Sequence, residues 1–140
     1  MSKVAVVYWS GTGNTKIMAQ EVAAGAEAAD AEVSIYTPSD FSADMMDQFD
    51  GIAFGCPSMG AEVLEEAEFE PMFNSCEPKL KGKKIALFGS YGWGDGEWMR
   101  SWEKTCTDDG ANLAYDCVLA NEEPDEDAKE SCRELGKALV

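Results

Sequence analysis

The sequence predicts an α/β protein in which a five-stranded, doubly wound parallel sheet lies between two layers of helices. Short apolar runs alternate with longer amphipathic segments along all 140 residues, without repeats or low-complexity linkers. The first run, residues 4–9, is apolar throughout, as is typical of a strand that is covered on both faces. Strands that alternate with helices in this way require right-handed crossovers, which produce a three-layer sheet.

The first half of the chain contains three of the predicted strands. After the strand at residues 4–9, one helical face is marked by Ile17, Met18, Val22 and Ala26. Residues 32–36 alternate apolar and polar side chains, as an edge strand does, and residues 51–56 form the next buried run. Between these two strands, residues 41–49 are expected to be a short helix or irregular.

The second half repeats the alternation, with strands predicted at residues 85–89 and 112–119. The apolar faces of the three predicted helices are Phe69, Met72, Phe73 and Cys76, then Trp98, Trp102 and Cys106, and finally Ala128, Cys132, Leu135 and Leu139. Pro71 is tolerated because it falls in the first turn of its helix. By the same strand and helix spacing, Trp9, Trp98 and Trp102 are predicted to be core residues.

Length and composition predict one cytoplasmic domain that spans residues 1–140 and has neither a signal peptide nor a membrane span. The five cysteines are an odd number and include no C-x-x-C pair, which argues against a disulfide framework or a zinc site. The chain has no histidine, so it lacks the usual general base and the hydrolase triads. Any reactivity is therefore expected to come from a bound cofactor.

The chain is strongly acidic, with 27 acidic and 11 basic residues and a formal net charge of -16. Such a charge repels nucleic acid and anionic membranes and steers the protein toward partners with basic docking surfaces. Solubility is an equally good explanation of the charge by itself. The acids gather in two runs, residues 62–77 and 122–134, which both begin just after predicted strand ends.

The segment behind the first strand is predicted to bind a phosphate monoester. It consists of Ser10, Gly11, Thr12, Gly13, Asn14 and Thr15. The two glycines let the backbone approach an anion closely, and the following helix N-terminus offers unpaired N–H groups. Lys16 stands where both a Walker A loop and a dinucleotide fingerprint require glycine, so neither pattern is met. An ordinary polar helix cap is the alternative.

Two more loops follow the third and fourth strands. The first contains Pro57, Ser58, Met59, Gly60, Ala61 and Glu62, and the second contains Ser90, Tyr91, Gly92 and Trp93. A flat aromatic ligand is expected between Met59 and Trp93, because both side chains offer polarizable surface. In a doubly wound sheet, ligands bind beyond the carboxyl ends of the strands, so the three loops are expected to converge.

With the closing segment at residues 121–126, these loops make nearly the whole chain resemble the short-chain flavodoxins of anaerobic bacteria. The last strand lacks the roughly twenty-residue insertion of long-chain members. The resemblance implies a flavodoxin-like strand order, 2-1-3-4-5, and bound FMN. It also implies a monomeric, low-potential, one-electron carrier that is not an enzyme and that cycles mainly between the neutral semiquinone and the anionic hydroquinone.

The resemblance also implies roles for individual residues. The FMN phosphate is expected to be held by Ser10, Thr12, Asn14, Thr15 and Ser90. Met59 covers the inner flavin face and Trp93 the outer one, while Gly60 turns its carbonyl toward flavin N5 when the first electron and a proton arrive. Glu62 accepts a hydrogen bond from flavin N3. The sequence departs from the family pattern at Lys16 and Ala61.

The alternative function is a flavodoxin-fold NAD(P)H:quinone reductase. Such enzymes need additional loops for a nicotinamide or quinone, and 140 residues leave little room for them. A phosphatase needs arginine six residues after Cys56, where Glu62 stands, and a receiver domain needs aspartate at the end of the third strand. Neither of these two non-redox functions fits the residues.

Overall fold

The structure, a computed structural model, describes residues 2–140 and contains a parallel sheet in the order β2-β1-β3-β4-β5, with β6 also paired to β4. The strands are β1 (Lys3–Tyr8), β2 (Glu32–Tyr36), β3 (Gly51–Gly55), β4 (Lys84–Tyr91), β5 (Asn112–Leu113) and β6 (Val118–Asn121). The α-helices are α1 (Asn14–Ala28), α2 (Phe69–Cys76), α3 (Glu97–Asp108) and α4 (Glu126–Ala138). Short 3₁₀ helices are η1 (Pro38–Asp40), η2 (Ala43–Gln48) and η3 (Glu77–Lys79). The predicted fold class and strand order are confirmed.

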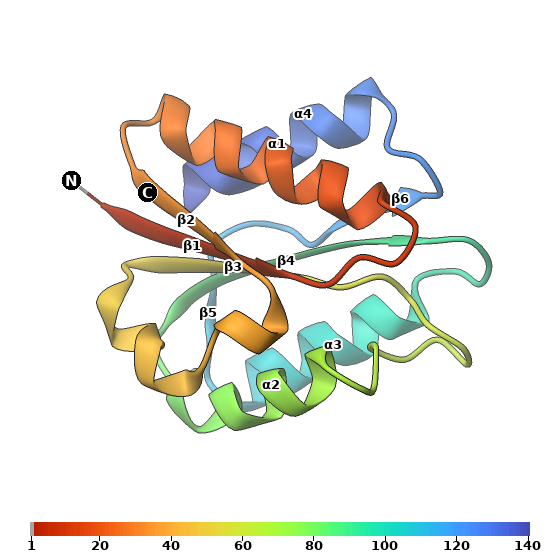
Figure 1. Ribbon diagram of the computed structural model, residues 1–140, viewed down its shortest axis with the longest axis horizontal. Coiled ribbons are helices and arrows are strands. Elements are labelled where there is room, and N and C mark those ends of the chain that lie inside the picture. Colours follow the sequence, from red (N-terminus) through yellow and green to blue (C-terminus); the bar gives the residue numbers. More distant parts are fainter. Residues whose placement is uncertain (1) are drawn as a thin grey trace.

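Helices cover both faces of the sheet, with α1 and α4 on one face and α2 and α3 on the other (Figure 1). Val4 and Val6 of β1 belong to the apolar cluster beneath α1 and α4, whereas Ala5 and Val7 belong to the cluster that faces α2 and α3. All four side chains are fully buried. A central strand with both faces covered needs apolar residues at successive positions, which explains the uninterrupted run.

Two glycines allow α1 and α4 to pack with their backbones in close approach. A Cβ atom added at Gly25 would lie 2.0 Å from the carbonyl oxygen of Arg133, and one added at Gly136 would lie 2.1 Å from that of Val22. Neither distance is possible for non-bonded atoms, so only glycine fits at these positions. The Arg133 guanidinium also reaches Glu21 of α1 at 2.6 Å.

The last strand differs from the continuous strand expected over residues 112–119. Residues 112–113 pair with residues 84–85 of β4, and residues 118–121 pair with residues 88–91, so four residues on one strand face two on the other. Asp116 lies in this exposed bulge. The expectation of one strand was wrong because a hydropathy pattern does not reveal where an edge strand carries extra, unpaired residues.

The expectations for residues 41–49 and for the helix that begins near Phe69 are confirmed, by η2 and α2. Glu65 fixes the start of α2: its carboxylate accepts hydrogen bonds from the N–H groups of residues 67, 68 and 69 at 2.9, 2.8 and 2.8 Å. Burial alone would raise the pKa of Glu65, but these three donors hold it below its usual value. The carboxylate therefore stays charged where it caps the helix.

All five cysteines are free thiols. Burial raises the pKa of Cys56, Cys106, Cys117 and Cys132 to about 12, and that of Cys76 is raised as well. Thiols that do not ionise near neutral pH are poor nucleophiles and metal ligands. Within residues 2–140, no cluster of potential metal ligands is present, and no helix combines the length and apolar character that a bilayer crossing requires.

Candidate functional site

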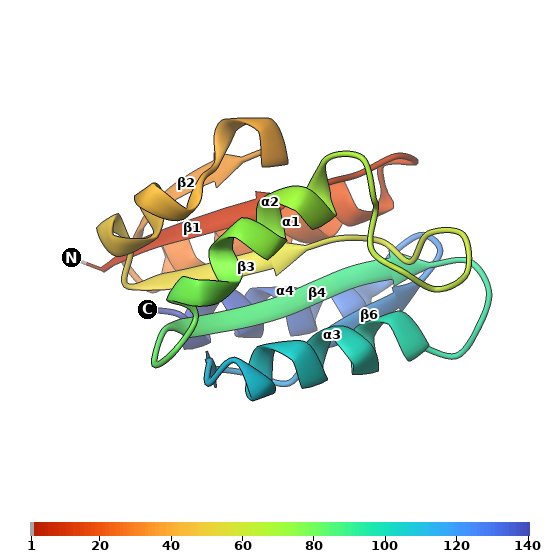
Figure 2. The same cartoon turned by 90° about the horizontal axis from the view of Figure 1, so that it is seen from below.

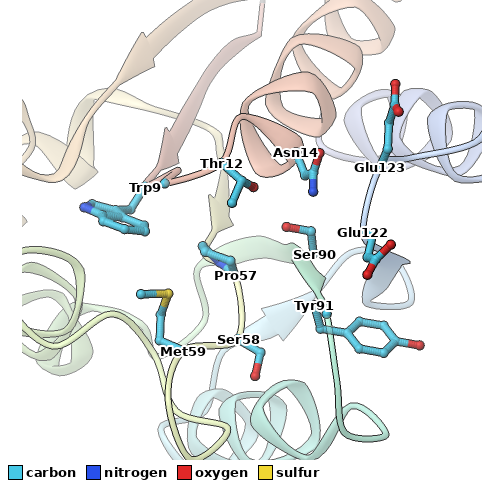
Figure 3. A pocket seen from close by; sticks show the side chains of 12 residues that line it. Trp9, Thr12, Asn14, Pro57, Ser58, Met59, Ser90, Tyr91, Glu122 and Glu123 are labelled. Carbon is cyan, nitrogen blue, oxygen red and sulfur yellow. The ribbon is translucent and has the colours of Figure 1, made fainter.

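Loops at the carboxyl ends of β1, β3, β4 and β6 enclose a cavity of about 550 Å³ (Figure 3). Its lining residues are Trp9, Gly11, Thr12, Asn14, Pro57, Ser58, Met59, Ser90, Tyr91, Gly92, Glu122 and Glu123. The volume falls within the range of small-molecule sites. The structure thus brings the three predicted loops together at one edge of the sheet.

The loop before α1 presents backbone donors rather than charged side chains. The Ser10 hydroxyl accepts hydrogen bonds from the N–H groups of Gly13 at 3.1 Å and Lys16 at 3.3 Å, which curls the loop back on itself. Gly13 has φ of 102°, a conformation that favours glycine. Within residues 2–140, the backbone N–H groups of Gly11, Thr12, Asn14 and Thr15 have no acceptor. Free N–H groups at a helix N-terminus are what an anion requires.

A buried pair of hydroxyl groups joins this loop to the sheet. Thr15 Oγ1 and Ser90 Oγ lie 2.8 Å apart, and the two residues are 1% and 4% exposed. Ser90 lines the cavity, whereas Thr15 does not, because its side chain is turned toward Ser90. The pair ties the first turn of α1 to the end of β4 and so fixes the N–H groups relative to the cavity.

Met59 lies at the base of a short hairpin that begins just after the cavity lining. Met59 and Val63 exchange two backbone hydrogen bonds, with Met59 N donating at 2.8 Å and Val63 N donating at 3.0 Å. Gly60 has φ of 49°, and within residues 2–140 no atom beyond Gly60 and its two chain neighbours lies within 4 Å of the place where a Cβ would be. Glycine is therefore favoured at position 60 by the backbone conformation alone and not by crowding.

Seven predicted cofactor contacts lie outside the cavity lining: Ser10, Gly13, Thr15, Gly60, Ala61, Glu62 and Trp93. Glu62 instead accepts a hydrogen bond from the N–H of Glu97, at the start of α3, at 3.2 Å. Its carboxylate also occupies the space beside Gly94, where an added Cβ would lie 2.4 Å from Glu62 Oε1. Trp93 is 63% exposed. Their contacts with a flavin stay predictions.

Trp9, Glu122 and Glu123 line the cavity although the sequence did not predict them as cofactor contacts. Trp9 was expected in the core, but it is only partly buried, and Figure 3 shows it on the same side of the cavity as Met59. In the sequence, Trp9 directly precedes the predicted phosphate loop, residues 10–15, and this position could have indicated that it lies at the cavity. By contrast, Trp98 and Trp102 are 1% and 3% exposed, as predicted.

The cavity carries negative charge at its rim. Glu122 and Glu123 lie opposite Trp9 and Met59 (Figure 3). Within residues 2–140, no lysine or arginine lines this cavity. Lys16 lines a neighbouring cavity of about 540 Å³ on the other side of the phosphate loop, together with Ser10 and Gly13. A phosphate bound in the cavity beside Met59 would therefore be held by uncharged donors.

Comparisons with known proteins agree with this geometry. The model of the flavodoxin family matches residues 6–136. The chain is 50% identical to a flavodoxin of Megasphaera elsdenii over 137 residues, which cover 98% of each chain. It is 45% identical to a flavodoxin of Clostridium beijerinckii over 135 residues, which cover 96% of this chain and 97% of the relative.

A solution structure of two-electron reduced Megasphaera elsdenii flavodoxin is similar to the whole fold. It superposes with a TM-score of 0.90 and 48% sequence identity, and the match covers 97% of both chains. The likeness therefore includes the loops at the carboxyl ends of the strands as well as the sheet. With the family match over residues 6–136, these similarities show that the chain belongs to the flavodoxin family, whose members carry electrons on bound FMN.

Proposed function

We propose that residues 1–140 form a single domain that holds FMN without a covalent bond and transfers one electron at a time at low potential. The observation that carries the proposal is the donor-rich loop at residues 10–15, which opens into the same cavity as Met59 and Tyr91. A phosphate fits the first feature and a flat ring fits the second. When bound, FMN supplies the redox chemistry, and the chain binds, orients and tunes it.

The proposed contacts divide by loop. Ser10, Gly11, Thr12, Gly13, Asn14, Thr15 and Ser90 surround the phosphate, with backbone N–H groups as the main donors. Pro57, Ser58, Met59, Gly60, Ala61 and Glu62 lie along one side of the ring, and Tyr91, Gly92 and Trp93 along the other. Trp93 is 63% exposed and does not line the cavity, so stacking on the ring would require its side chain to turn toward the cavity. For Glu62 to reach the ring, its carboxylate must leave the N–H of Glu97.

Gly60 is proposed to stabilise the neutral semiquinone. Its carbonyl would turn toward the flavin when the first electron and a proton arrive, and the positive φ of Gly60, 49°, supports a position where glycine is favoured. Only glycine changes between turn types at low cost. Gly60→Val is therefore expected to destabilise the semiquinone selectively. Equal first-electron potentials in the variant and the parent, measured by redox titration, would contradict this role.

Acidic side chains are proposed to lower the second potential, at which the anionic hydroquinone forms. One carboxylate about 10 Å from a negative flavin costs roughly 1.7 kcal/mol at an effective dielectric of about 20. Because about 59 mV corresponds to a tenfold change for one electron, this is roughly 70 mV before salt screening. Glu122 and Glu123, the two carboxylates that line the cavity, are candidates within a chain of net charge -16.

The proposed partners are redox proteins with basic docking surfaces, and the proposed working form is a cytoplasmic monomer. The net charge supports the first statement. Five free thiols are typical of a reducing compartment. Close relatives are named flavodoxins and are electron carriers, so the quinone reductase is not favoured.

A reductive titration of the purified protein with added FMN tests the function. The expected result is one equivalent of bound flavin that accumulates a neutral semiquinone on stepwise reduction, followed by visible spectroscopy. Oxidation of NAD(P)H with a quinone by the protein alone is the control reaction and is expected to be negligible. Failure to bind FMN, or reduction in one two-electron step, would refute the proposal.

A further inference from the structure

The loop at residues 57–64, which carries Met59 and Gly60, is closed at both ends by buried residues. The chain leaves the sheet at Cys56, directly after β3, and returns at Glu65, shortly before α2. Cys56 and Glu65 are 0% and 7% exposed. The N–H of Glu65 donates to Cys56 Sγ at 3.4 Å, so the two ends of the loop are in direct contact. Figure 2 shows this loop projecting beyond the end of β3 and returning to α2.

Cys56 fixes the first end of the loop to the sheet and to α3. Its N–H donates to the carbonyl oxygen of Phe88 in β4 at 3.2 Å, and its own carbonyl oxygen accepts the indole N–H of Trp98 at 3.1 Å. A side chain at position 89 would collide with that carbonyl oxygen, because a Cβ added at Gly89 would lie 2.2 Å from it. This end therefore cannot shift without breaking contacts in the buried core.

Glu65 fixes the second end through all of its polar groups. Its N–H reaches Cys56, and its carbonyl oxygen accepts the N–H of Glu70 at 2.9 Å. Its carboxylate accepts the N–H groups of residues 67–69. A buried charge is costly unless such donors surround it. An ordinary N-cap side chain accepts from one such N–H group, so Glu65 holds more of the backbone than the start of a helix requires.

We propose that Glu65 and Cys56 are positioning residues that clamp the 57–64 loop in place against the flavin. Rotation of the peptide group after Gly60 is confined to two dihedral angles, ψ of residue 60 and φ of residue 61, if both ends of the loop stay fixed. The Met59–Val63 pair then keeps Met59 at the cavity while the carbonyl turns. This inference rests on the proposed function of Gly60.

Loss of the clamp changes electron uptake in a direction that a simple change of charge does not. A loop with a free end samples more conformations, and restricting it to the one that meets the reduced flavin costs entropy. The first-electron potential therefore falls when the clamp is lost. Removal of one negative charge by itself favours electron uptake and raises the potential. The sign of the shift separates the two effects.

Glu65→Gln and Glu66→Gln form a matched pair of variants. Each removes one carboxylate, at neighbouring positions, but Glu66 is exposed and is not part of the clamp. In Glu65→Gln, the amide oxygen can still accept from the N–H groups of residues 68 and 69. The amide nitrogen then faces the N–H of Ala67, so that a donor meets a donor and the clamp is weakened.

Amide hydrogen exchange of the protein without FMN, followed by NMR, measures the clamp itself. The N–H groups of Met59 and Val63 are expected to exchange at least about tenfold faster in Glu65→Gln and within about twofold of the parent in Glu66→Gln. The N–H of Ala128, bonded to Asp125 at the start of α4, is the internal reference and is expected to stay nearly unchanged in both. Unchanged exchange at Met59 and Val63 in Glu65→Gln, or an equal increase at Ala128, would overturn the inference.

Redox titration of the FMN-loaded protein measures the consequence for electron transfer. Glu65→Gln is expected to disfavour uptake of the first electron about tenfold, a fall in potential of about 59 mV, whereas Glu66→Gln is expected to leave the potential unchanged or slightly higher. Cys56→Ala removes the sulfur acceptor but keeps the carboxylate, and a fall of about threefold in the same equilibrium is expected. This variant decides the question if Glu65→Gln does not fold.

An unchanged or raised first-electron potential in Glu65→Gln, or equal shifts in the two glutamine variants, would overturn the inference. An unchanged potential in Cys56→Ala would overturn it where that variant decides. Failure of the parent to bind FMN would instead refute the proposed function, and the exchange measurement without FMN would still test the clamp.

Discussion

The buried Thr15–Ser90 hydrogen bond offers a test of how the fold positions the phosphate loop. We consider Thr15→Val, Ser90→Ala and the double variant. The hydroxyl groups lie 2.8 Å apart, with the residues 1% and 4% exposed, so neither can turn to bulk solvent when its partner is removed. Each single variant therefore loses the hydrogen bond and also leaves the other hydroxyl group unpaired.

The magnitude follows from that asymmetry. Loss of one hydrogen bond lowers the free energy of unfolding by about 1 kcal/mol. Because the remaining hydroxyl group is then buried without a partner, each single variant is expected to lose about 1–3 kcal/mol. The double variant leaves no hydroxyl group unpaired, so its loss in free energy of unfolding is expected to be smaller than the sum of the two single losses. The free energies of unfolding are thus expected to show a coupling of about 1 kcal/mol.

Urea unfolding without FMN measures the coupling, and fluorescence titration measures the consequence for binding. Each single variant is expected to weaken FMN binding about tenfold, because the misaligned N–H donors are expected to lose about 1.4 kcal/mol of binding free energy, which corresponds to that factor. Riboflavin, which lacks the phosphate, is expected to bind the variants and the parent alike. Additive unfolding energies, or equal losses for FMN and riboflavin, would refute the claim that this pair positions the phosphate donors.

Three further outcomes are expected. Trp93→Ala should weaken FMN binding and brighten flavin fluorescence, because a stacked indole quenches emission; unchanged emission at saturating FMN would mean that Trp93 does not stack. Gly25→Ala should lower the free energy of unfolding by about 3 kcal/mol, because its Cβ would lie 2.0 Å from a backbone oxygen of α4. Gly92→Ala, which enters open space, is the control in the same urea measurement, and equal effects would contradict the packing argument. Burial, and then Asp109, raise the pKa of Glu77 from 4.5 to about 7, so its stabilising effect is complete below pH 4.5 and is lost as the pH rises through 7. Relative to Glu77→Gln, the parent should lose about 1 kcal/mol between pH 5 and 8, after allowance for solvent screening, and parallel stability curves would argue against the shift.

Much of the fold could be predicted because its signals are local. The buried run at residues 4–9 and the helical stripes at residues 69–76 and 98–106 depend only on side-chain hydrophobicity at fixed spacing. The bulge at residues 114–117 could not be predicted, because strand register is decided by the neighbouring strand.

The site was predictable to the same extent. The loop at residues 10–15, Met59 and Ser90 could be predicted to lie together because small, hydroxyl and soft side chains follow strand ends, and these residues lie at the cavity or immediately beside it. Their contacts with FMN stay predictions. The placement of Trp9 at the cavity rather than in the core was missed. Strand spacing places a residue on a face of the sheet, but exposure at the end of a strand depends on which loops cover it.

The sequence by itself determined the class of this protein: a doubly wound sheet, an uncharged, hydroxyl-rich and glycine-containing loop at residues 10–15, and a strong negative charge, which are all properties of composition and short-range order. Only the tertiary structure decided which side chains meet. The pairing of Thr15 with Ser90, the contact of Glu62 with the start of α3 and the hydrogen bond from Trp98 to Cys56 join groups distant in the chain. The physical reason is that hydrogen bonds and close packing act over a few ångströms in space, whatever the separation along the sequence.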